Sequence, residues 1–492
     1  MVQSIRKQIM EELPLWDQPS ISVGIIKNGE VVLKEGFGFA DEGKNLKADA
    51  DTMYQIGSCS KAFTAAAVAL LVDQGKIGWD VPVKTYMPWI EFKDPFVTEN
   101  VTVRDLLCHR TGLPRHDAYW IGTPVTREEM VRNLRNMQPC WSFRSQWCYQ
   151  NTCYVAAGML IETVSGMSWE EFVKENIFLP LGMNRSTFYV DVIEGDANRA
   201  APYARCLPTD MNGYEQVPFL KSVQEDMAKG IGAPYGPAGS IMSTINDMMK
   251  WVAFNLNNGK VGDKQIISEA NMKEIHKPQM LMSEPLLVPF PEQDFYSYAM
   301  GWFTESYRGH MMVEHGGNIN GFSALVTMIP DMELGVVTLT NFDNSFNTYA
   351  TTYSILDAYM GAENGDWHKR WRELIAQVFT SAPEQTKALN GEKIEGTVPS
   401  RALEGFVGTY NNATYGDLVI GMEDGKLTFA YGEGKSALEH FHYDTFTITN
   451  PKHLFAGMNL TFLTDKFGKL SISFDIVLNP AAQAEIFTKK AD

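Results

Sequence analysis

Strands are predicted near the start of the chain and again some 300 residues later. Ser20–Lys27 and Glu30–Lys34 are apolar-rich segments joined by Asn28-Gly29, a dipeptide typical of tight β-hairpins. Ala324–Met328 and Val336–Thr340 show a similar pattern on either side of a Pro-Asp turn. The pattern therefore predicts one sheet assembled from segments that are far apart in the sequence.

Helical periodicity dominates the stretch between these strands. Apolar positions recur at helical spacing in Thr126–Met137, Ala156–Ser165 and Ile245–Asn255. The apolar run Ala62–Val72 predicts a buried helix, and it is too short to span a bilayer. No membrane span is therefore predicted.

The pattern changes towards the C-terminus. Asp366–Phe379 predicts an amphipathic helix that closes the first domain, and the polar, Pro- and Gly-containing stretch after it predicts a linker that few contacts cross. From about Leu403, short alternating strands with Asp424-Gly425 as a turn predict a small barrel or sandwich. The expected domains are residues 1–380, a linker at 381–402, and residues 403–492.

Composition is that of a globular protein of two or three domains. The 492 residues are 45% hydrophobic and 12% aromatic. A net charge of −17 disfavours nucleic acid and anionic membranes as partners, since both attract basic clusters. Met1–Lys7 leads into Glu11 and Glu12 with no apolar segment between. No signal peptide is therefore predicted, and we expect a cytoplasmic protein, or an exported one if a signal was removed.

The six cysteines do not require disulfides, because a chain of this size builds cores without them. Cys59 would lie inside a predicted helix and Cys148 beside Tyr149, both poor places for a cross-link. The sequence favours free thiols in a reducing compartment.

Candidate chemistry begins with Ser58-Cys59-Ser60-Lys61, directly before the apolar run. Residues three apart share one face of a helix, so the Ser58 hydroxyl and the Lys61 amine are expected to be neighbours. Serine needs a partner that takes its proton, and burial near a helix N-terminus lowers the pKa of a lysine. Ser58 is the predicted nucleophile, since Cys59 would face away from Lys61. A second match, at residues 4–7, has no apolar helix behind it and is attributed to chance.

Two later motifs supply the other groups that acyl transfer needs. Tyr149-Gln150-Asn151 offers a phenol for proton transfer and an amide for the substrate. His315-Gly316-Gly317 follows a predicted strand at Met312-Val313, and its glycines would let the backbone approach a ligand closely. Each motif has decoys, such as Tyr410-Asn411-Asn412, but all three in this order are specific.

Together the motifs resemble the S-x-x-K, Y-x-N and K-T-G or H-x-G set of the class C β-lactamase, D,D-peptidase and esterase superfamily of serine hydrolases. Leu106–Pro114, Gly236–Ser240 and Tyr298–Trp302 are similar to further family segments, so the resemblance covers about residues 10 to 360. It implies an α+β fold, in which an antiparallel sheet is flanked by helices and an all-helical region lies alongside. Phe406–Tyr410 and Tyr415-Gly416 resemble a lipocalin-like C-terminal module, which implies an additional all-β barrel-like domain.

The resemblance also implies a role for each motif residue. Ser58 would form an acyl-enzyme whose oxyanion is held by the amides of Ser58 and Asn318. Tyr149 would act as general base and then acid, with a phenol pKa pulled down by a nearby lysine ammonium. Asn151 would contact the substrate amide and help to fix Lys61.

His315 departs from the β-lactamase pattern, which has a lysine there to hold the substrate carboxylate. Histidine is mostly neutral above about pH 6.5, so the fixed cation is lost. Because H-x-G is characteristic of the esterase and D-aminopeptidase branches, ester or amide hydrolysis is favoured over β-lactam hydrolysis. A structural histidine buried in the sheet is the alternative. His109 and His116 are expected to shape a loop beside the cleft.

The predicted function is that of a cofactor-independent serine hydrolase acting on esters, small amides or peptides, with D-configured substrates among the candidates. Acyl transfer to an acceptor other than water and a penicillin-binding sensor without turnover are the alternatives. No metal is predicted, because His440-Phe441-His442 lacks a third ligand, and no nucleotide-binding motif occurs. The C-terminal module contains none of the three motifs and is expected to cover the cleft mouth, limit substrate size or mediate homo-oligomerisation.

Overall fold

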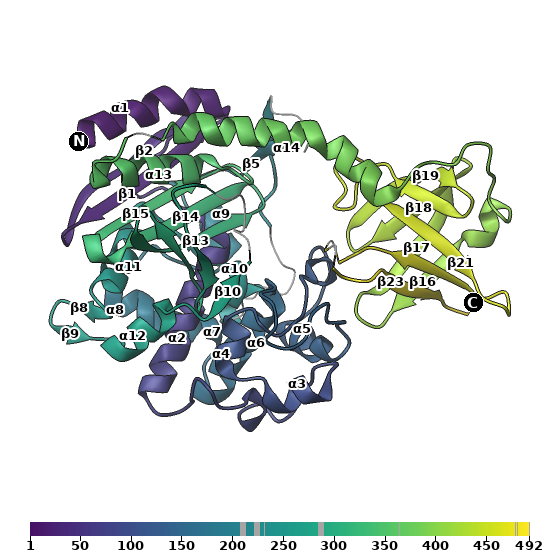
Figure 1. Cartoon of the computed structure of the whole chain (residues 1–492), viewed down its shortest axis with the longest axis horizontal. Helices are drawn as coiled ribbons and strands as arrows, with labels where there is room; N and C mark the ends of the chain where they lie inside the picture. The colour runs from purple at the N-terminus through teal and green to yellow at the C-terminus, as the bar shows by residue number, and fades with distance from the viewer. Residues whose placement is uncertain are drawn as a thin grey trace.

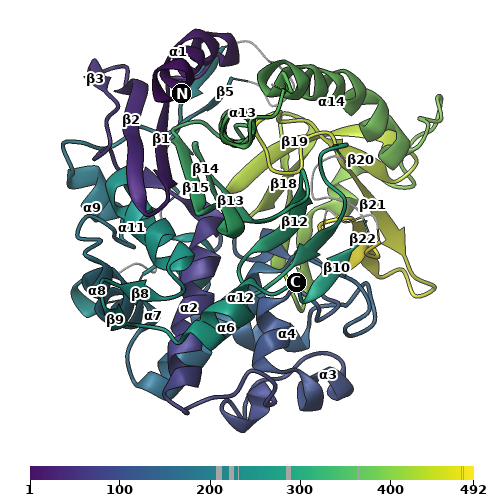
Figure 2. The ribbon, with the colours of Figure 1, turned by 60° about the vertical axis from the view of Figure 1, so that its left-hand side comes forward.

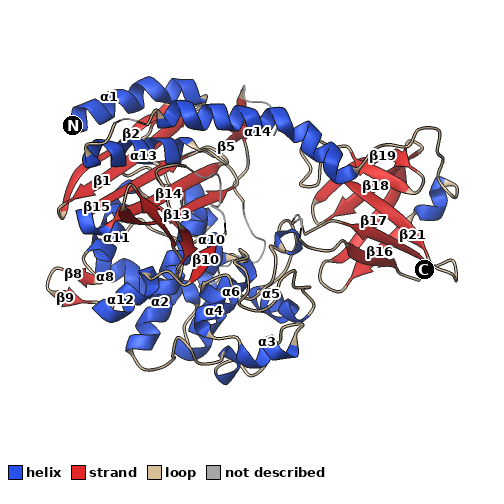
Figure 3. Cartoon of the chain, in the orientation of Figure 1, coloured by secondary structure: helices blue, strands red, loops and turns tan. Residues whose placement is uncertain are grey.

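A sheet with helices on both faces, a helical region beside it and a C-terminal barrel make up the computed structural model (Figure 1; Figure 3). The structure describes residues 1–206, 213–220, 227–230, 232–283, 290–363, 365–477, 479 and 481–491. Within them the main sheet has the antiparallel strand order β10-β11-β12-β13-β14-β15-β1-β2-β3. Its strands are β1 (Ser20–Lys27), β2 (Glu30–Asp41), β3 (Leu46–Lys47), β10 (Met280–Met282), β11 (Tyr296–Tyr298), β12 (Phe303–Tyr307), β13 (His310–Ile319), β14 (Phe322–Ile329) and β15 (Leu334–Thr340).

Pairing of the first strand with the last unites the two ends of this domain, as the sequence predicts. Val23 of β1 lies opposite Thr338 of β15. The hairpin between β1 and β2 turns at Asn28 and Gly29, whose φ angles are 53° and 78°. Two successive positive φ angles match the twist of paired strands, which is why this dipeptide forms the turn.

Helices cover both faces of the sheet. Helices α1, α13 and α14 pack on one face, while α2 and α11 pack on the other (Figure 1). Their bounds, with those of the helical region, are α1 (Val2–Glu12), α2 (Ser60–Asp73), α3 (Pro95–Asn100), α4 (Val103–Leu107), α5 (Arg127–Arg132), α6 (Asn151–Ser165), α7 (Trp169–Val173), α8 (Leu179–Leu181), α9 (Val190–Gly195), α10 (Gly236–Gly239), α11 (Ile245–Leu256), α12 (Glu269–His276), α13 (Asn347–Met360) and α14 (Trp367–Asn390). Short strand pairs are β4 (Tyr54–Gln55) with β7 (Met242–Ser243), β5 (Tyr203–Arg205) with β6 (Tyr214–Gln216), and β8 (Lys260–Val261) with β9 (Lys264–Gln265).

Helix α2 forms the centre of the larger core. Nearly all of its residues are buried, which agrees with the apolar run in the sequence. In Figure 2 it runs from the sheet down into the helical region. A short 3₁₀ turn, η2 (Gly57–Cys59), precedes it and packs against β13.

The C-terminal residues form a closed antiparallel barrel, which fulfils the prediction of a barrel or sandwich. The barrel closes where Tyr410 of β16 pairs with Lys489 of β23. Its strands are β16 (Gly408–Asn412), β17 (Gly416–Glu423), β18 (Lys426–Tyr431), β19 (Gly434–His442), β20 (Thr445–Ile448), β21 (Asn459–Thr464), β22 (Leu470–Phe474) and β23 (Glu485–Lys489).

The connection to the barrel differs from the predicted linker. Helix α14 does not end at Phe379 but continues to Asn390, whose side chain donates to Gly457 O at 2.7 Å. The polar composition suggested a loop, yet residues such as Glu384, Lys387 and Leu389 have high helix propensity. The predicted linker 381–402 is therefore helical up to Asn390, and only residues 391–402 form a non-helical connection to the barrel.

The barrel also contacts the helical region directly, in contrast to the expectation that few contacts cross between them. Asn133 Nδ2 donates to Thr414 O at 2.8 Å, and Glu433 N donates to Gly122 O at 3.1 Å. The sequence gives no local sign of these contacts, because their partners lie about 300 residues apart.

All six cysteines are free thiols, in agreement with the sequence-based preference. Cys140 and Cys148 lie in contact, with their sulfurs 3.9 Å apart. Among the helices in the described ranges, none has an apolar stretch long enough to cross a membrane.

Two carboxyl groups are buried in the sheet under α13. Burial raises the pKa of Glu305 and Glu314, and Glu314 raises that of Glu305 further. Thr327 Oγ1 donates to Glu314 at 2.9 Å, which opposes the rise only in part. The pKa of Glu314 reaches about 7, so the folded protein retains a proton that the unfolded chain releases above pH 4.5.

We predict that Glu314→Gln changes how stability depends on pH. A raised carboxyl pKa means that stability is lost as pH rises from 4.5 to about 7. The variant lacks this loss, so its Tm relative to wild type should increase across that window and stay level above it. Differential scanning fluorimetry measures the difference, with the exposed Glu99→Gln as control. A Tm difference that is constant with pH would contradict the assignment.

Candidate active site

Ser58 sits in a turn that touches strand β13 backbone to backbone. A Cβ atom on Gly317 would lie 2.0 Å from Ile56 O and 2.9 Å from Ser58 N, and one on Gly57 would lie 2.9 Å from Asn318 N. Gly57 also has a φ of 50°, which disfavours other residues. Glycine is required at both positions, and the amides of Ser58 and Asn318 both border this contact.

The Lys61 amine is fully buried beside the Ser58 hydroxyl. Its Nζ lies 3.0 Å from Ser58 Oγ, 2.8 Å from Asn151 Oδ1 and 2.8 Å from Ala238 O. Burial lowers the pKa of Lys61 well below its usual value, as the sequence predicts, and the charge of Arg115 lowers it further.

A neutral amine has two N–H bonds and one lone pair, which suits these three partners. The carbonyl oxygens of Asn151 and Ala238 can only accept, so they take the two N–H groups. The lone pair then faces the hydroxyl of Ser58, which can donate to it. Lys61 is therefore placed to remove the serine proton.

Asn151 is held in this orientation from its other side. Its Nδ2 donates to Asp117 Oδ1 at 2.8 Å, which directs its Oδ1 to Lys61. Asp117 also forms an ion pair with Arg115. The guanidinium of Arg115 lies over the ring of Tyr149, 5.1 Å from its centroid.

Tyr149 packs close to the same amine, with Lys61 Nζ 4.7 Å from its ring centroid and the His109 ring at 4.3 Å. The predicted lowering of its pKa is wrong. Burial raises the pKa of Tyr149, whereas the charge of Arg115 and a hydrogen bond with Ser58 lower it by less. The buried Lys61 does not provide the ammonium that the prediction assumed. Tyr149 is consequently a protonated phenol at neutral pH, able to donate.

His315 points into an aromatic cluster and is buried, with 2% of its surface exposed. Its Nδ1 donates to Gly316 O at 2.6 Å, and its Nε2 accepts from Tyr298 Oη at 3.0 Å. Burial, followed by the nearby Lys61, lowers its pKa to about 3. His315 is thus neutral, and this placement favours the structural alternative over direct contact with a substrate anion.

The other residues of this strand also lie near the turn. A Cβ on Gly316 would come within 2.6 Å of Tyr349 Oη. Asn318 is exposed, and its Oδ1 accepts from Ser323 Oγ at 2.7 Å. The eight predicted site residues therefore come from one region around η2, α2, α6 and β13.

Cys59 has a structural contact in place of a reactive one. Its thiol donates to His315 O at 3.1 Å and ties the start of α2 to β13. Burial raises its pKa to about 12, so the thiol remains protonated.

Several partners of these residues are not predicted by the sequence motifs. Ala238 lies in a segment noted as similar to the family, but nothing indicated that its carbonyl meets Lys61. Arg115 and Asp117 are the sequence neighbours of His116, which is expected in a loop beside the cleft. Their position next to His116 is the sequence signal that could have identified them. Tyr298 begins another noted segment.

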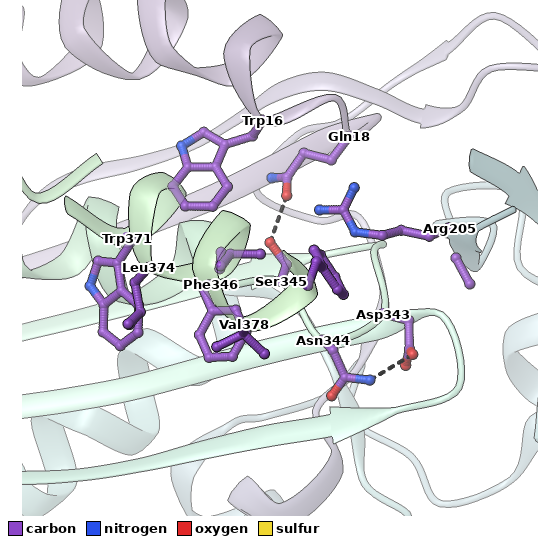
Figure 4. A pocket seen from close by; sticks show the side chains of 13 residues that line it. Trp16, Gln18, Arg205, Asp343, Asn344, Ser345, Phe346, Trp371, Leu374 and Val378 are labelled. Atoms are coloured by element: carbon purple, nitrogen blue, oxygen red, sulfur yellow. Dashed lines mark hydrogen bonds between the residues drawn. The ribbon is translucent and has the colours of Figure 1, made fainter. Parts of the chain in front are cut away.

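A pocket of about 470 Å³ lies on the α13–α14 side of the sheet (Figure 4). Trp16, Phe346 and Trp371 supply apolar walls, and Ser345 Oγ donates to Gln18 Oε1 at 2.6 Å. None of the motif residues lines it, so the candidate active site is the cluster around Ser58.

Comparisons with known proteins identify relatives of both parts of the chain. A family model described as Beta-lactamase matches residues 11–359, and one described as a domain of unknown function, DUF3471, matches residues 392–488. Unguisins hydrolase ungD from Aspergillus violaceofuscus is 30% identical over 495 residues, which cover 90% of this chain and 82% of that protein.

Solved structures share the fold. An octameric penicillin-binding protein homologue from Pyrococcus abyssi has a TM-score of 0.63 and 24% identity, with 99% of this chain and 100% of that chain covered. A D-amino acid amidase from Ochrobactrum anthropi has a TM-score of 0.58 and 19% identity, covering 73% of this chain and 99% of that chain.

We predict that Gly317→Ala disables the site. Its Cβ would require Ile56 O, 2.0 Å away, to move, and the turn carrying Ser58 would move with it. Covalent labelling of Ser58 by a fluorophosphonate should fall by about 100-fold or more, the effect expected when a reacting group is misplaced. Gly195→Ala is the control, because its Cβ would meet nothing within 4 Å. Labelling of Gly317→Ala at the wild-type rate would show that the close approach is not needed.

Proposed function

Because the chain belongs to the Beta-lactamase family, a family of serine hydrolases, we propose that Ser58 attacks esters, small amides and peptides and forms an acyl-enzyme that water resolves. The observation that carries this proposal is the buried Lys61 Nζ, 3.0 Å from Ser58 Oγ. No cofactor is needed for this chemistry, because the serine, amine and phenol supply the nucleophile and the proton transfers.

Attack begins when the Ser58 proton passes to the lone pair of Lys61. The burial that keeps the amine neutral makes it a competent base. The carbonyl oxygen of the substrate becomes an oxyanion, for which the amides of Ser58 and Asn318 are the candidate donors. Tyr149, protonated at neutral pH, then donates to the leaving group and is reprotonated from Lys61. Water then attacks the acyl-enzyme, and the same proton transfers run in the reverse direction to release the acyl product and restore Ser58.

Substrates without an essential carboxylate suit this site best. The position that would hold a cationic lysine has a neutral, buried His315. One relative is named as a hydrolase of unguisins and one structural neighbour as an amidase of D-amino acids. These names support amides and peptides, including D-configured ones, as the first substrates to test.

Ser58→Ala should abolish both turnover and fluorophosphonate labelling. Turnover is expected to fall by about 10⁴-fold or more, because the covalent route is lost and only residual binding effects remain. Cys59→Ala is the matched control and should retain most activity, since its thiol is protonated and bonded to His315 O. Retained labelling in Ser58→Ala would refute the proposal.

Among substrates, neutral p-nitrophenyl esters and D-aminoacyl anilides should be hydrolysed with a higher kcat/KM than the anionic β-lactam nitrocefin. The missing fixed cation removes about 1.5 to 3 kcal/mol of binding to a carboxylate, or roughly tenfold to 150-fold. Steady release of product after any initial burst identifies a hydrolase. A burst alone identifies a sensor, and a rate that rises with added nucleophile identifies acyl transfer. Nitrocefin turnover equal to that of the esters would contradict the substrate assignment.

A further inference from the structure

The C-terminal barrel contacts the loop that borders the candidate active site. Tyr415 Oη lies 2.6 Å from His116 Nδ1, and both residues are buried. His116 Nε2 lies 3.4 Å from Gln138 O, which can only accept, so Nε2 carries the proton and Nδ1 accepts from Tyr415. Burial lowers the pKa of His116 to about 4, which keeps this arrangement at neutral pH.

Apolar packing reinforces the hydrogen bond. Ala118 is buried within the barrel's own apolar cluster, and Tyr119 packs against it. Further along the helical region, Thr414 Oγ1 donates to Asn136 O at 3.2 Å. The segment 116–119 is thus seated on the barrel.

The residues on either side of His116 reach the site instead. Arg115 lies over the Tyr149 ring, and Asp117 accepts from Asn151 Nδ2 at 2.8 Å. Asn151 in turn accepts from Lys61 at 2.8 Å. A short chain of contacts therefore runs from Tyr415 through His116 and Asp117 to the amine beside Ser58.

We propose that Tyr415 is a positioning residue for the reaction, supplied by the barrel. This inference rests on the proposed function of Ser58. By fixing His116, Tyr415 holds Asp117 where it orients the Asn151 amide.

The orientation of that amide decides what Lys61 can do. If Asp117 moves, the Asn151 amide can turn over and present its N–H₂ group to Lys61. The amine lone pair would then accept from Asn151, and it would no longer face the Ser58 hydroxyl. The barrel keeps the base available in this way, without touching the substrate.

The test compares Tyr415→Phe with Tyr410→Phe in the full-length chain. Tyr410 is also a buried barrel tyrosine, but its hydroxyl donates to Phe406 O at 2.7 Å inside the barrel. Saturating fluorophosphonate labelling of Ser58 gives a rate constant and an inhibitor affinity, and Tm is measured alongside. Tyr415→Phe should lower the rate constant about tenfold, the effect of one lost buried hydrogen bond, with unchanged affinity. Tyr410→Phe should keep the wild-type rate constant.

A second background separates positioning from a general loss of folding. Asp117→Asn removes the carboxylate through which Tyr415 acts, so adding Tyr415→Phe to it should cause no further loss of rate. The same tenfold loss in both backgrounds, or equal rates for Tyr415→Phe and Tyr410→Phe, would overturn the inference. Absence of Ser58 labelling in the wild type would instead overturn the proposed function itself.

Discussion

The burial of one amine sets the conditions for the rest of the site. Lys61 is a fully buried residue, and a charge there is unfavourable unless it is paired. Burial therefore keeps the amine neutral, and its N–H groups and lone pair meet three polar partners from different elements: Asn151 of α6, Ala238 of α10 and Ser58 of the turn before α2. Any shift of these elements relative to one another would leave a buried polar group without a partner. Stability and reactivity therefore depend on the same contacts.

The surrounding sheet holds the elements around Lys61 in place mainly by close packing, and less by charged groups. Glycines at positions 57 and 317 let two backbones approach, and the Cys59 thiol ties the helix start to the same strand. Neutral His315 and Tyr298 fill the space beyond with an uncharged, hydrogen-bonded pair. Arg115 is the charged group that lies over the Tyr149 ring, and it belongs to a loop whose other face is covered by the barrel.

The parts of the molecule that depend on local sequence pattern are predictable from the sequence. The Asn28-Gly29 hairpin follows from turn geometry. The helix after Ser58 follows from its continuous apolar run, which is buried. The proximity of Lys61 to Ser58 follows from helical spacing. The pKa shift of Tyr149 does not follow from local pattern. Its direction is set by burial, which outweighs the charge of Arg115, a residue distant from Tyr149 in the sequence. The contact between His116 and Tyr415 joins residues that lie 299 positions apart, and no periodic pattern in the sequence indicates it.

Helix α14 makes the spacing between the two folded parts depend on residue number. Each residue added to a helix advances it by about 1.5 Å and rotates it by about 100°. Its first turns pack on the sheet domain through Trp367 and Trp371, and its end is bonded to the barrel at Asn390. A single-residue insertion or deletion would therefore swing the barrel around the helix axis. An insertion of one whole turn would restore the rotation but still move the barrel by about 5.4 Å along the axis, so the direct contact between barrel and loop ties both ends of this helix to a fixed length, a restriction that an unstructured tether would not impose.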